Sequence, residues 1–264
     1  MYITLRKRCF IPLNKIEKQT FTKRKRKGMN KERIDKIIST SLNIPRNMAK
    51  LQIRRGKVKV DGVVCRDPSL HFDANSCEIE YKGEKIGYNK FRYIMLNKPK
   101  GVLSASSDKT RKTVVDLVDE SIRRFDLAPV GRLDKDTTGL ILITNDGEFA
   151  HNVISPKKQI EKTYIVTLDG SLPEDADQRF LEGIVLADGT KCLPARLEML
   201  ESNVAKVVIM EGKYHQIKRM FGAIGLGVNE LKRVAIGGLY LPNDLPEGAS
   251  RELTKEESSL IFNK

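Results

Sequence analysis

Residues 129–147 read PVGRLDKDTTGLILITNDG. The first part is polar and holds two carboxylates, Asp134 and Asp136, beside Arg132 and between two glycines. Glycine adopts backbone conformations that other residues avoid, so such a loop can fold tightly and bring a carboxylate against a bound ligand. The apolar run at 140–143 then predicts a buried strand. A second interpretation stays open, because loop aspartates often do no more than cap a turn.

Further apolar runs lie on both sides of this loop, at residues 93–96, 164–168, 204–209 and 234–236. Each predicts a strand. A helix is predicted at 173–181, because Pro173 suits a first helical turn and Gly183 a C-terminal cap. A shorter helix is predicted at 217–224, where apolar residues recur at helical spacing. Strands interrupted by helices indicate an α+β fold, with a mixed, largely antiparallel sheet and flanking helices.

The N-terminal third has a different pattern. Apolar residues recur every three or four positions at 34–42, and again at 48–53 after Pro45, which predicts two helices that each bury one face. Asp61-Gly62 then stands between valines, a strong short signal for a tight β-hairpin. A strand is expected at 78–81, and the polar segment 83–90, with two glycines, marks a domain boundary. A small domain of helices and strands therefore precedes the larger one.

The first 28 residues carry most of the positive charge. They hold ten lysines and arginines against one acidic residue, Glu17, while the whole chain has a net charge of +14. Five consecutive like charges at 23–27 repel one another, so we expect residues 1–28 to be a basic, disordered extension. Three origins stay open: an arm that contacts RNA, an organelle targeting peptide, or upstream sequence if Met29 is the true start.

Composition restricts the class of protein. The 40% hydrophobic and 31% charged residues, and the lack of an apolar run near the roughly 18 residues of a membrane span, predict a soluble protein with no membrane partner. Four scattered cysteines without a Cys-x-x-Cys pair fit free thiols in a reducing cytoplasm, and with three scattered histidines they predict neither disulfides nor a metal site. The basic balance favours a polyanionic partner, because lysine and arginine displace counterions from phosphates.

The small N-terminal domain resembles a known RNA-binding module. Arg33-Ile34-Asp35-Lys36 and the run IRRGKVKVDG at 53–62 are similar to the S4 domain. The resemblance gives a domain at 29–87 and implies two helices that present basic side chains to structured RNA. The residues assigned to this surface are Arg33, Arg46, Lys50, Arg54, Arg55 and Lys57. Spacing alone is also compatible with a solvated, charged helix face.

The larger domain resembles the RsuA-type pseudouridine synthases. Its motif GRLD, followed by TTGL, an aliphatic run and TNDG, is similar to the central motif of that family, and LNKPKG at 96–101 and EGKYHQIKRM at 211–220 agree with it. The resemblance implies a synthase domain at 92–264, which detaches uracil at N1 and rejoins it to the same ribose carbon through C5. Because no atom is added and no redox change occurs, no cofactor and no metal are expected.

The same resemblance assigns roles to individual residues. Asp134 is the essential carboxylate, and Lys218 is the basic residue that pairs with it and keeps it ionised. Tyr164 is expected against the uracil ring, where its hydroxyl assists removal of the C5 proton; otherwise it is a core tyrosine of a strand. Arg132 and Arg219 are expected to bind substrate, with Arg132 filling the gap that the flipped uridine leaves.

The expected partner is ribosomal RNA. Within the family, EKTY at 161–164 and YHQIKRM at 214–220 are most similar to members that act on small-subunit (16S) ribosomal RNA. We therefore expect a monomeric enzyme that modifies one uridine of that RNA or of its assembly intermediate. Three alternatives stay open: a family member that acts on large-subunit ribosomal RNA, a non-catalytic RNA-binding protein of ribosome assembly and, because Asp134 and Asp136 are paired carboxylates, a glycoside hydrolase.

Overall fold

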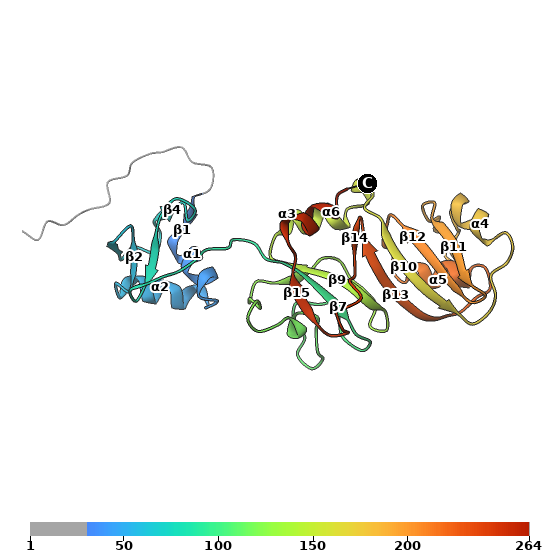
Figure 1. The fold of residues 1–264 in the computed structure, drawn as a ribbon, viewed down its shortest axis with the longest axis horizontal. Coiled ribbons are helices and arrows are strands. Elements are labelled where there is room, and N and C mark those ends of the chain that lie inside the picture. Colours follow the sequence, from blue (N-terminus) through green and yellow to red (C-terminus); the bar gives the residue numbers. More distant parts are fainter. Residues whose placement is uncertain (1–30, 264) are drawn as a thin grey trace, which may run out of the picture. The chain divides into compact units, whose positions relative to one another are not determined.

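Two compact units make up the described part of the chain. The computed structural model describes residues 31–263, so the basic extension predicted at 1–28 lies outside the described residues. The first unit ends at Tyr88 and the second begins at Asn89 (Figure 1). None of the helices described in residues 31–263 combines the length and the apolar character that crossing a bilayer requires.

The first unit packs two helices against a small antiparallel sheet. Helices α1 (Ile34–Ser41) and α2 (Arg46–Arg54) bury their isoleucines and Ala49 in one core with Val58 and Val60. The sheet has the order β3-β2-β5-β6, with β2 Val58–Val60, β3 Val63–Cys65, β5 Ile79–Tyr81 and β6 Glu84–Lys85. A separate pair joins β1 (Glu32–Arg33) to β4 (His71–Phe72).

The turn between β2 and β3 explains the Asp-Gly pair in the sequence. Asp61 and Gly62 both have positive φ angles, of 49° and 77°, as a two-residue hairpin turn of this kind requires. The Asp61 carboxylate also accepts a hydrogen bond of 2.8 Å from the Glu78 amide, which ties the turn to the residue before β5. The two helices and the hairpin predicted for this unit are therefore confirmed.

The second unit is built on a nine-stranded sheet (Figure 1). Its main path is β11-β12-β10-β13-β9-β7-β15, with β14 added to β13 and β8 to β9. Among the described pairs only β13 and β9 run parallel, so the sheet is mixed and largely antiparallel, as predicted. The strands are β7 Tyr93–Lys98, β8 Ala128–Pro129, β9 Thr138–Thr144, β10 Lys162–Leu168, β11 Arg196–Glu201, β12 Val204–Ile209, β13 Val228–Ile236, β14 Leu239–Tyr240 and β15 Ser250–Glu252.

Two apolar cores form on this sheet. Helices α4 (Ala176–Glu182) and α5 (Gln216–Gly222) contribute Phe180 and Phe221 to a core that includes Ile141 of β9. Helix α3 (Gly147–Ile154) and the chain just after α6 (Lys255–Leu260) join a second core that includes Leu140. Neighbouring residues of β9 thus enter different cores, and every residue of this strand is buried. The α+β fold predicted from the sequence is confirmed.

Helix α4 begins later than the sequence predicts. The predicted helix starts at Pro173, whereas α4 starts at Ala176, because Pro173 belongs to a preceding turn in which the Ala176 amide donates a 3.1 Å hydrogen bond to the Pro173 carbonyl oxygen. Strand β11 has no counterpart among the predicted strands. Five of its six residues are exposed, so its sequence contains no apolar run.

Candidate active site

A buried cation anchors the loop that carries Asp134. The ammonium group of Lys98, the last residue of β7, donates hydrogen bonds to the carbonyl oxygens of Pro99, Lys135 and Thr137 at 3.2, 3.1 and 2.8 Å. The Lys98 side chain is fully buried. Burial lowers its pKa to about 8, although the nearby carboxylates of residues 134 and 136 act in the opposite direction. Three carbonyl oxygens thus take the place of water around this ammonium and fix the loop backbone.

Two further contacts fix the residues on either side of Asp134. The Ser104 hydroxyl donates to the Leu133 carbonyl oxygen at 2.7 Å and accepts from the Leu133 amide at 3.0 Å. The Gly101 amide donates to the Lys135 carbonyl oxygen at 2.8 Å. The backbone on both sides of Asp134 is therefore held by hydrogen bonds.

Gly139 allows the strand after the loop to approach β13 closely. Its φ angle is +96°, and a Cβ atom at this position would lie 2.2 Å from the Arg233 carbonyl oxygen. Only glycine adopts this positive φ angle without strain and leaves room for the Arg233 backbone. Gly139 stands opposite Arg233 in the parallel pair of β9 and β13, and the Arg233 side chain donates to the Leu140 carbonyl oxygen at 2.7 Å. The Asp134 loop therefore enters the sheet where parallel and antiparallel pairing meet.

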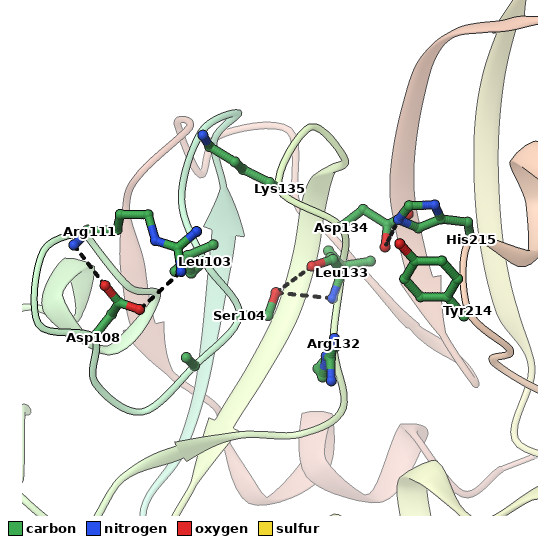
Figure 2. Close-up of a pocket in the computed structure, with 11 residues that line it drawn as sticks. Leu103, Ser104, Asp108, Arg111, Arg132, Leu133, Asp134, Lys135, Tyr214 and His215 are labelled. Atoms are coloured by element: carbon green, nitrogen blue, oxygen red, sulfur yellow. Dashed lines mark hydrogen bonds and ion pairs between the residues drawn. The ribbon is translucent and has the colours of Figure 1, made fainter.

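Asp134 lines a cleft of about 390 Å³ (Figure 2). Its Oδ1 lies 3.5 Å from Nε2 of His215, and 28% of its side chain is exposed, so the carboxylate is open to a ligand. The other residues that line the cleft are mostly basic, aromatic or small: Leu103, Ser104, Ala105, Asp108, Arg111, Arg132, Leu133, Lys135, Tyr214 and His215. The described residues contain no group of three or more His, Cys, Asp or Glu side chains that could hold a metal ion.

Lys218 pairs with a different aspartate from the one expected. Its ammonium group donates a hydrogen bond to Oδ2 of Asp136, and this bond holds the pKa of Asp136 below its ordinary value. No ion pair joins Lys218 to Asp134 in the structure described here. Asp134 begins a turn, closed by the 3.2 Å hydrogen bond from the Thr137 amide to its carbonyl oxygen, so the two carboxylates meet different side chains. The expected pairing is corrected accordingly.

The remaining predicted residues occupy three different environments. Arg132 is exposed and lines the cleft. Tyr164, on β10, is 8% exposed and lies in the core with α4 and α5; its hydroxyl makes no hydrogen bond to a described residue, and it does not line the cleft. Arg219 donates to Oδ2 of Asp188 at 2.5 Å and also lies outside the lining. Of the site residues predicted from the sequence, Asp134 and Arg132 therefore line the cleft, whereas Tyr164, Lys218 and Arg219 do not.

In the first unit, a buried carboxylate organises two of the predicted RNA-binding residues. Asp35 is fully buried and pairs with Arg33 and Arg46, each at 2.9 Å. Burial raises the pKa of Asp35, but the hydrogen bonds and charges of the two arginines outweigh it, and the net shift is downward. Both arginine side chains remain more than one third exposed, so their outer atoms can reach a ligand.

The other basic residues of this unit follow α2. Arg46, Lys50 and Arg54 are four residues apart and therefore share one face of the helix. Arg55 and Lys57, just beyond the helix, are exposed, as is Arg54. Five of the six residues predicted to contact RNA thus form a basic stripe along α2 and the turn that follows it, whereas Arg33 lies on β1.

Three residues around Asp134 have no role in the sequence prediction. Lys98 lies in the motif at 96–101, but nothing in the sequence shows that its ammonium group is buried. Ser104 has no sequence signal at all. His215 entered the sequence analysis only as one of three scattered histidines that predict no metal site; its place in the motif at 211–220, beside predicted site residues, is the signal that could have identified it.

Comparison with known families agrees with both units. Residues 92–223 match the family model described as RNA pseudouridylate synthase. Residues 32–76 match the S4 domain model. The cleft residues Arg132, Asp134, Tyr214 and His215 lie within the first of these matches.

Curated proteins and a solved structure are similar over most of the chain. Ribosomal small subunit pseudouridine synthase A of Escherichia coli K12 is 40% identical over 233 residues, which are 87% of this chain and 99% of that protein. An uncharacterized RNA pseudouridine synthase of Bacillus subtilis, YtzG, is also 40% identical, over 87% of this chain and 98% of its own. A crystal structure of a pseudouridylate synthase matches with 36% identity and a TM-score of 0.62, over 87% of this chain and 99% of that one. The chain therefore belongs to the RNA pseudouridylate synthase family and is an RsuA-type isomerase with an N-terminal S4 domain.

Proposed function

We propose that the cleft at Asp134 isomerises one uridine of small-subunit ribosomal RNA, with Asp134 as the essential carboxylate. The observation that carries this proposal is the position of Asp134, which is open to a ligand while its backbone neighbours are held by Ser104 and Gly101. A preorganised charged group of this kind stabilises the charge that develops in a transition state without reorganisation at the moment of reaction.

The chemistry needs few protein groups. The bond between N1 of uracil and C1′ of the ribose breaks, the base turns, C5 bonds to C1′, and the C5 proton is lost while N1 gains one. Asp134 takes part by attacking the ribose carbon, by attacking the pyrimidine ring, or by removing a proton from C2′. Each route requires an ionised carboxylate at the ribose or the base, in a site that confines the detached uracil.

The remaining residues support this reaction. Tyr164, buried on β10 outside the cleft lining, comes against the uracil ring in the proposed complex once the RNA is bound, and its hydroxyl, which has no partner in the described structure, then assists removal of the C5 proton. Lys218 supplies positive charge to the loop through its ion pair with Asp136. Arg132, exposed in the cleft, occupies the space that the flipped uridine leaves, and Arg219 binds the RNA backbone.

The S4 unit binds the folded RNA through the basic stripe along α2. Lysine and arginine bind phosphates mainly through counterion release, which is independent of sequence. Arg33, Arg46, Lys50, Arg54, Arg55 and Lys57 therefore position the substrate, while the cleft selects the uridine. The proposed enzyme acts as a monomer, and sedimentation at working concentration tests this.

The similarity to the E. coli enzyme supports small-subunit ribosomal RNA as the substrate, because it extends over 99% of that protein. The test is to incubate the protein separately with small-subunit and large-subunit ribosomal RNA labelled with tritium at uridine C5. Release of tritium from the small-subunit RNA alone supports the proposal. Release from the large-subunit RNA alone would contradict it and show that the enzyme modifies large-subunit ribosomal RNA.

The same experiment excludes two other classes of activity. A non-catalytic assembly protein releases no tritium from either RNA. A glycoside hydrolase liberates free uracil, which chromatography detects, whereas an isomerase returns the base to the chain as pseudouridine.

A further inference from the structure

Tyr214 and His215 form a stacked pair of aromatic rings beside Asp134. Their ring centroids are 3.8 Å apart and the ring planes differ by 20°. The imidazole contacts Asp134, with 3.5 Å between Nε2 and Oδ1. His215 covers one face of the Tyr214 ring, and the residue is still 71% exposed. The uncovered face of a large apolar ring is therefore open at the cleft.

This pair stands on a rigid turn. The buried Gln216 side chain accepts a 2.9 Å hydrogen bond from the Lys213 amide and donates one of 2.8 Å to Glu211. Glu211, which is also buried, accepts a further bond of 3.0 Å from the Leu193 amide. Two buried polar side chains thus fix the turn at both ends, so the Tyr214 ring is presented without a large ordering cost on binding.

The cleft has an aromatic end, formed by Tyr214 and His215, and basic side chains along the rest of its lining. In Figure 2, Tyr214 and His215 lie beside Asp134, and Arg111 lies at the far end of the cleft, where Asp108 holds it at 3.2 Å. Arg132 and Lys135 line the same cleft. A chain that alternates flat bases with anionic phosphates matches this arrangement, because bases stack on aromatic rings while phosphates pair with cations.

We propose that the open face of Tyr214 stacks with the unpaired base of a nucleotide next to the target uridine. The inference rests on the proposed function, which puts the target ribose at Asp134. His215 contacts that carboxylate, and the outer face of Tyr214 lies one ring further away. The base on Tyr214 is therefore that of a neighbouring nucleotide, and the stacking helps to hold the target uridine out of the RNA stack.

Substitution of Tyr214 tests the inference. Tyr214→Ala is expected to lower kcat/KM on naked small-subunit ribosomal RNA by about 5- to 150-fold, the range for one base–aromatic stack. Tyr214→Phe keeps the ring and is expected to stay within about twofold of the wild type. Tyr240→Ala, at a 64% exposed tyrosine on β14 outside the cleft, is the matched control and is expected to change nothing.

Tryptophan fluorescence measures the stacking directly. The chain contains no tryptophan, so Tyr214→Trp introduces a single indole fluorophore. Its emission is expected to be quenched when the RNA binds, whereas the emission of Tyr240→Trp is expected to respond little. After mapping of the modified uridine, removal of the stacked neighbouring base is expected to lower kcat/KM in the wild type but not in Tyr214→Ala.

The outcomes separate this inference from the proposed function. If the wild type releases no tritium from any ribosomal RNA, the proposed function fails. If the wild type is active and Tyr214→Ala is equally active, or Tyr214→Phe loses as much as Tyr214→Ala, the stacking inference is overturned. A defect that appears only on protein-containing assembly intermediates also overturns it, since Tyr214 would then contact a protein.

Discussion

The ammonium group of Lys218 pairs with the carboxylate of Asp136, while the carboxylate of Asp134 lies 3.5 Å from His215. Two aspartates of one loop thus contact two residues of one segment, 215–218. This division leaves Asp134 facing the cleft, with the imidazole of His215 rather than the ammonium group of Lys218 as its neighbour. Lys218 therefore acts on the pKa of Asp136, which stands two residues after the proposed catalytic Asp134.

Lys218→Met is expected to raise the pKa of Asp136 toward its ordinary value. The Lys218 hydrogen bond lowers that pKa, so its loss must shift the titration of the carboxyl to higher pH. NMR titration of the Asp136 carboxyl carbon measures the shift. In the same variant kcat is expected to fall about 10- to 100-fold, as for loss of one charge-assisted hydrogen bond. An unchanged Asp136 titration would mean that the pair does not form in solution.

Lys98→Met is expected to destabilise the loop by about 1–3 kcal/mol, because three carbonyl oxygens lose their buried donor. Burial lowers the pKa of Lys98 to about 8, so the unfolded chain binds this proton more tightly than the folded one. The wild-type residue therefore adds stability as the pH rises from about 8 toward 10.5. The stability difference from Lys98→Met is expected to widen over that range.

Urea unfolding at pH 7.5 and pH 10 measures both effects. Lys100→Met is the control, because Lys100 is half exposed and pairs on the surface with Glu230. That variant is expected to change stability by less than about 1 kcal/mol at either pH. A pH-independent loss in Lys98→Met would show that Lys98 is not a buried, proton-binding group.

Gly139→Ala and Gly101→Ala make a matched pair at two positive φ angles, +96° and +87°. The new Cβ at 139 would lie 2.2 Å from the Arg233 carbonyl oxygen, whereas the one at 101 meets nothing within 4 Å. Gly101→Ala is expected to cost only backbone strain, about 1–2 kcal/mol. Gly139→Ala is expected to cost about 3 kcal/mol or more, because strain and overpacking combine. Equal losses in urea unfolding would contradict the close approach of β9 to β13.

Asp35→Asn is expected to weaken the first unit by about 1–3 kcal/mol near neutral pH, because two arginines lose their buried partner. The pKa of Asp35 is lowered in the folded state. Its stabilising effect is therefore complete above the unfolded value near 3.8 and disappears as the pH falls through the folded value. The wild type and Asp35→Asn are expected to converge in stability at low pH.

Equilibrium unfolding from pH 7 to pH 2, followed by a probe within the first unit, measures this convergence. Asp73→Asn is a suitable control, since the Asp73 carboxylate accepts an exposed hydrogen bond from the Asn75 amide within a turn. A constant difference between the wild type and Asp35→Asn at all pH values would contradict an ionised, arginine-bound Asp35.

Local patterns in the sequence predicted much of the fold. The isoleucines at 34, 37 and 38 share one helix face and are all fully buried, and Asp61-Gly62 forms the expected hairpin turn. β11 was not predicted because this edge strand is mostly exposed and its apolar residues, Leu197, Met199 and Leu200, form no continuous run. Where partners lie far apart in the sequence, as for Gly139 and Arg233, only the assembled sheet shows their contact.

The candidate site was predictable in its residues but not in its contacts. The motif around Asp134 marked the carboxylate that lines the cleft. The sequence placed Lys218 on Asp134, whereas the turn after Asp134 directs Lys218 to Asp136. The Ser104 contact with Leu133 joins residues 29 positions apart through a loop with no periodic pattern, so no sequence signal could reveal it.

The most direct test of the central claim is the release of tritium from uridine C5 by Asp134→Asn. Under single-turnover conditions with small-subunit ribosomal RNA, this isosteric change is expected to lower the rate by about a thousandfold or more. RNA affinity and the unfolding midpoint are expected to stay close to those of the wild type, because the carboxylate is partly exposed and anchors no backbone of its neighbours. Release at a rate within tenfold of the wild type would contradict Asp134 as the catalytic carboxylate.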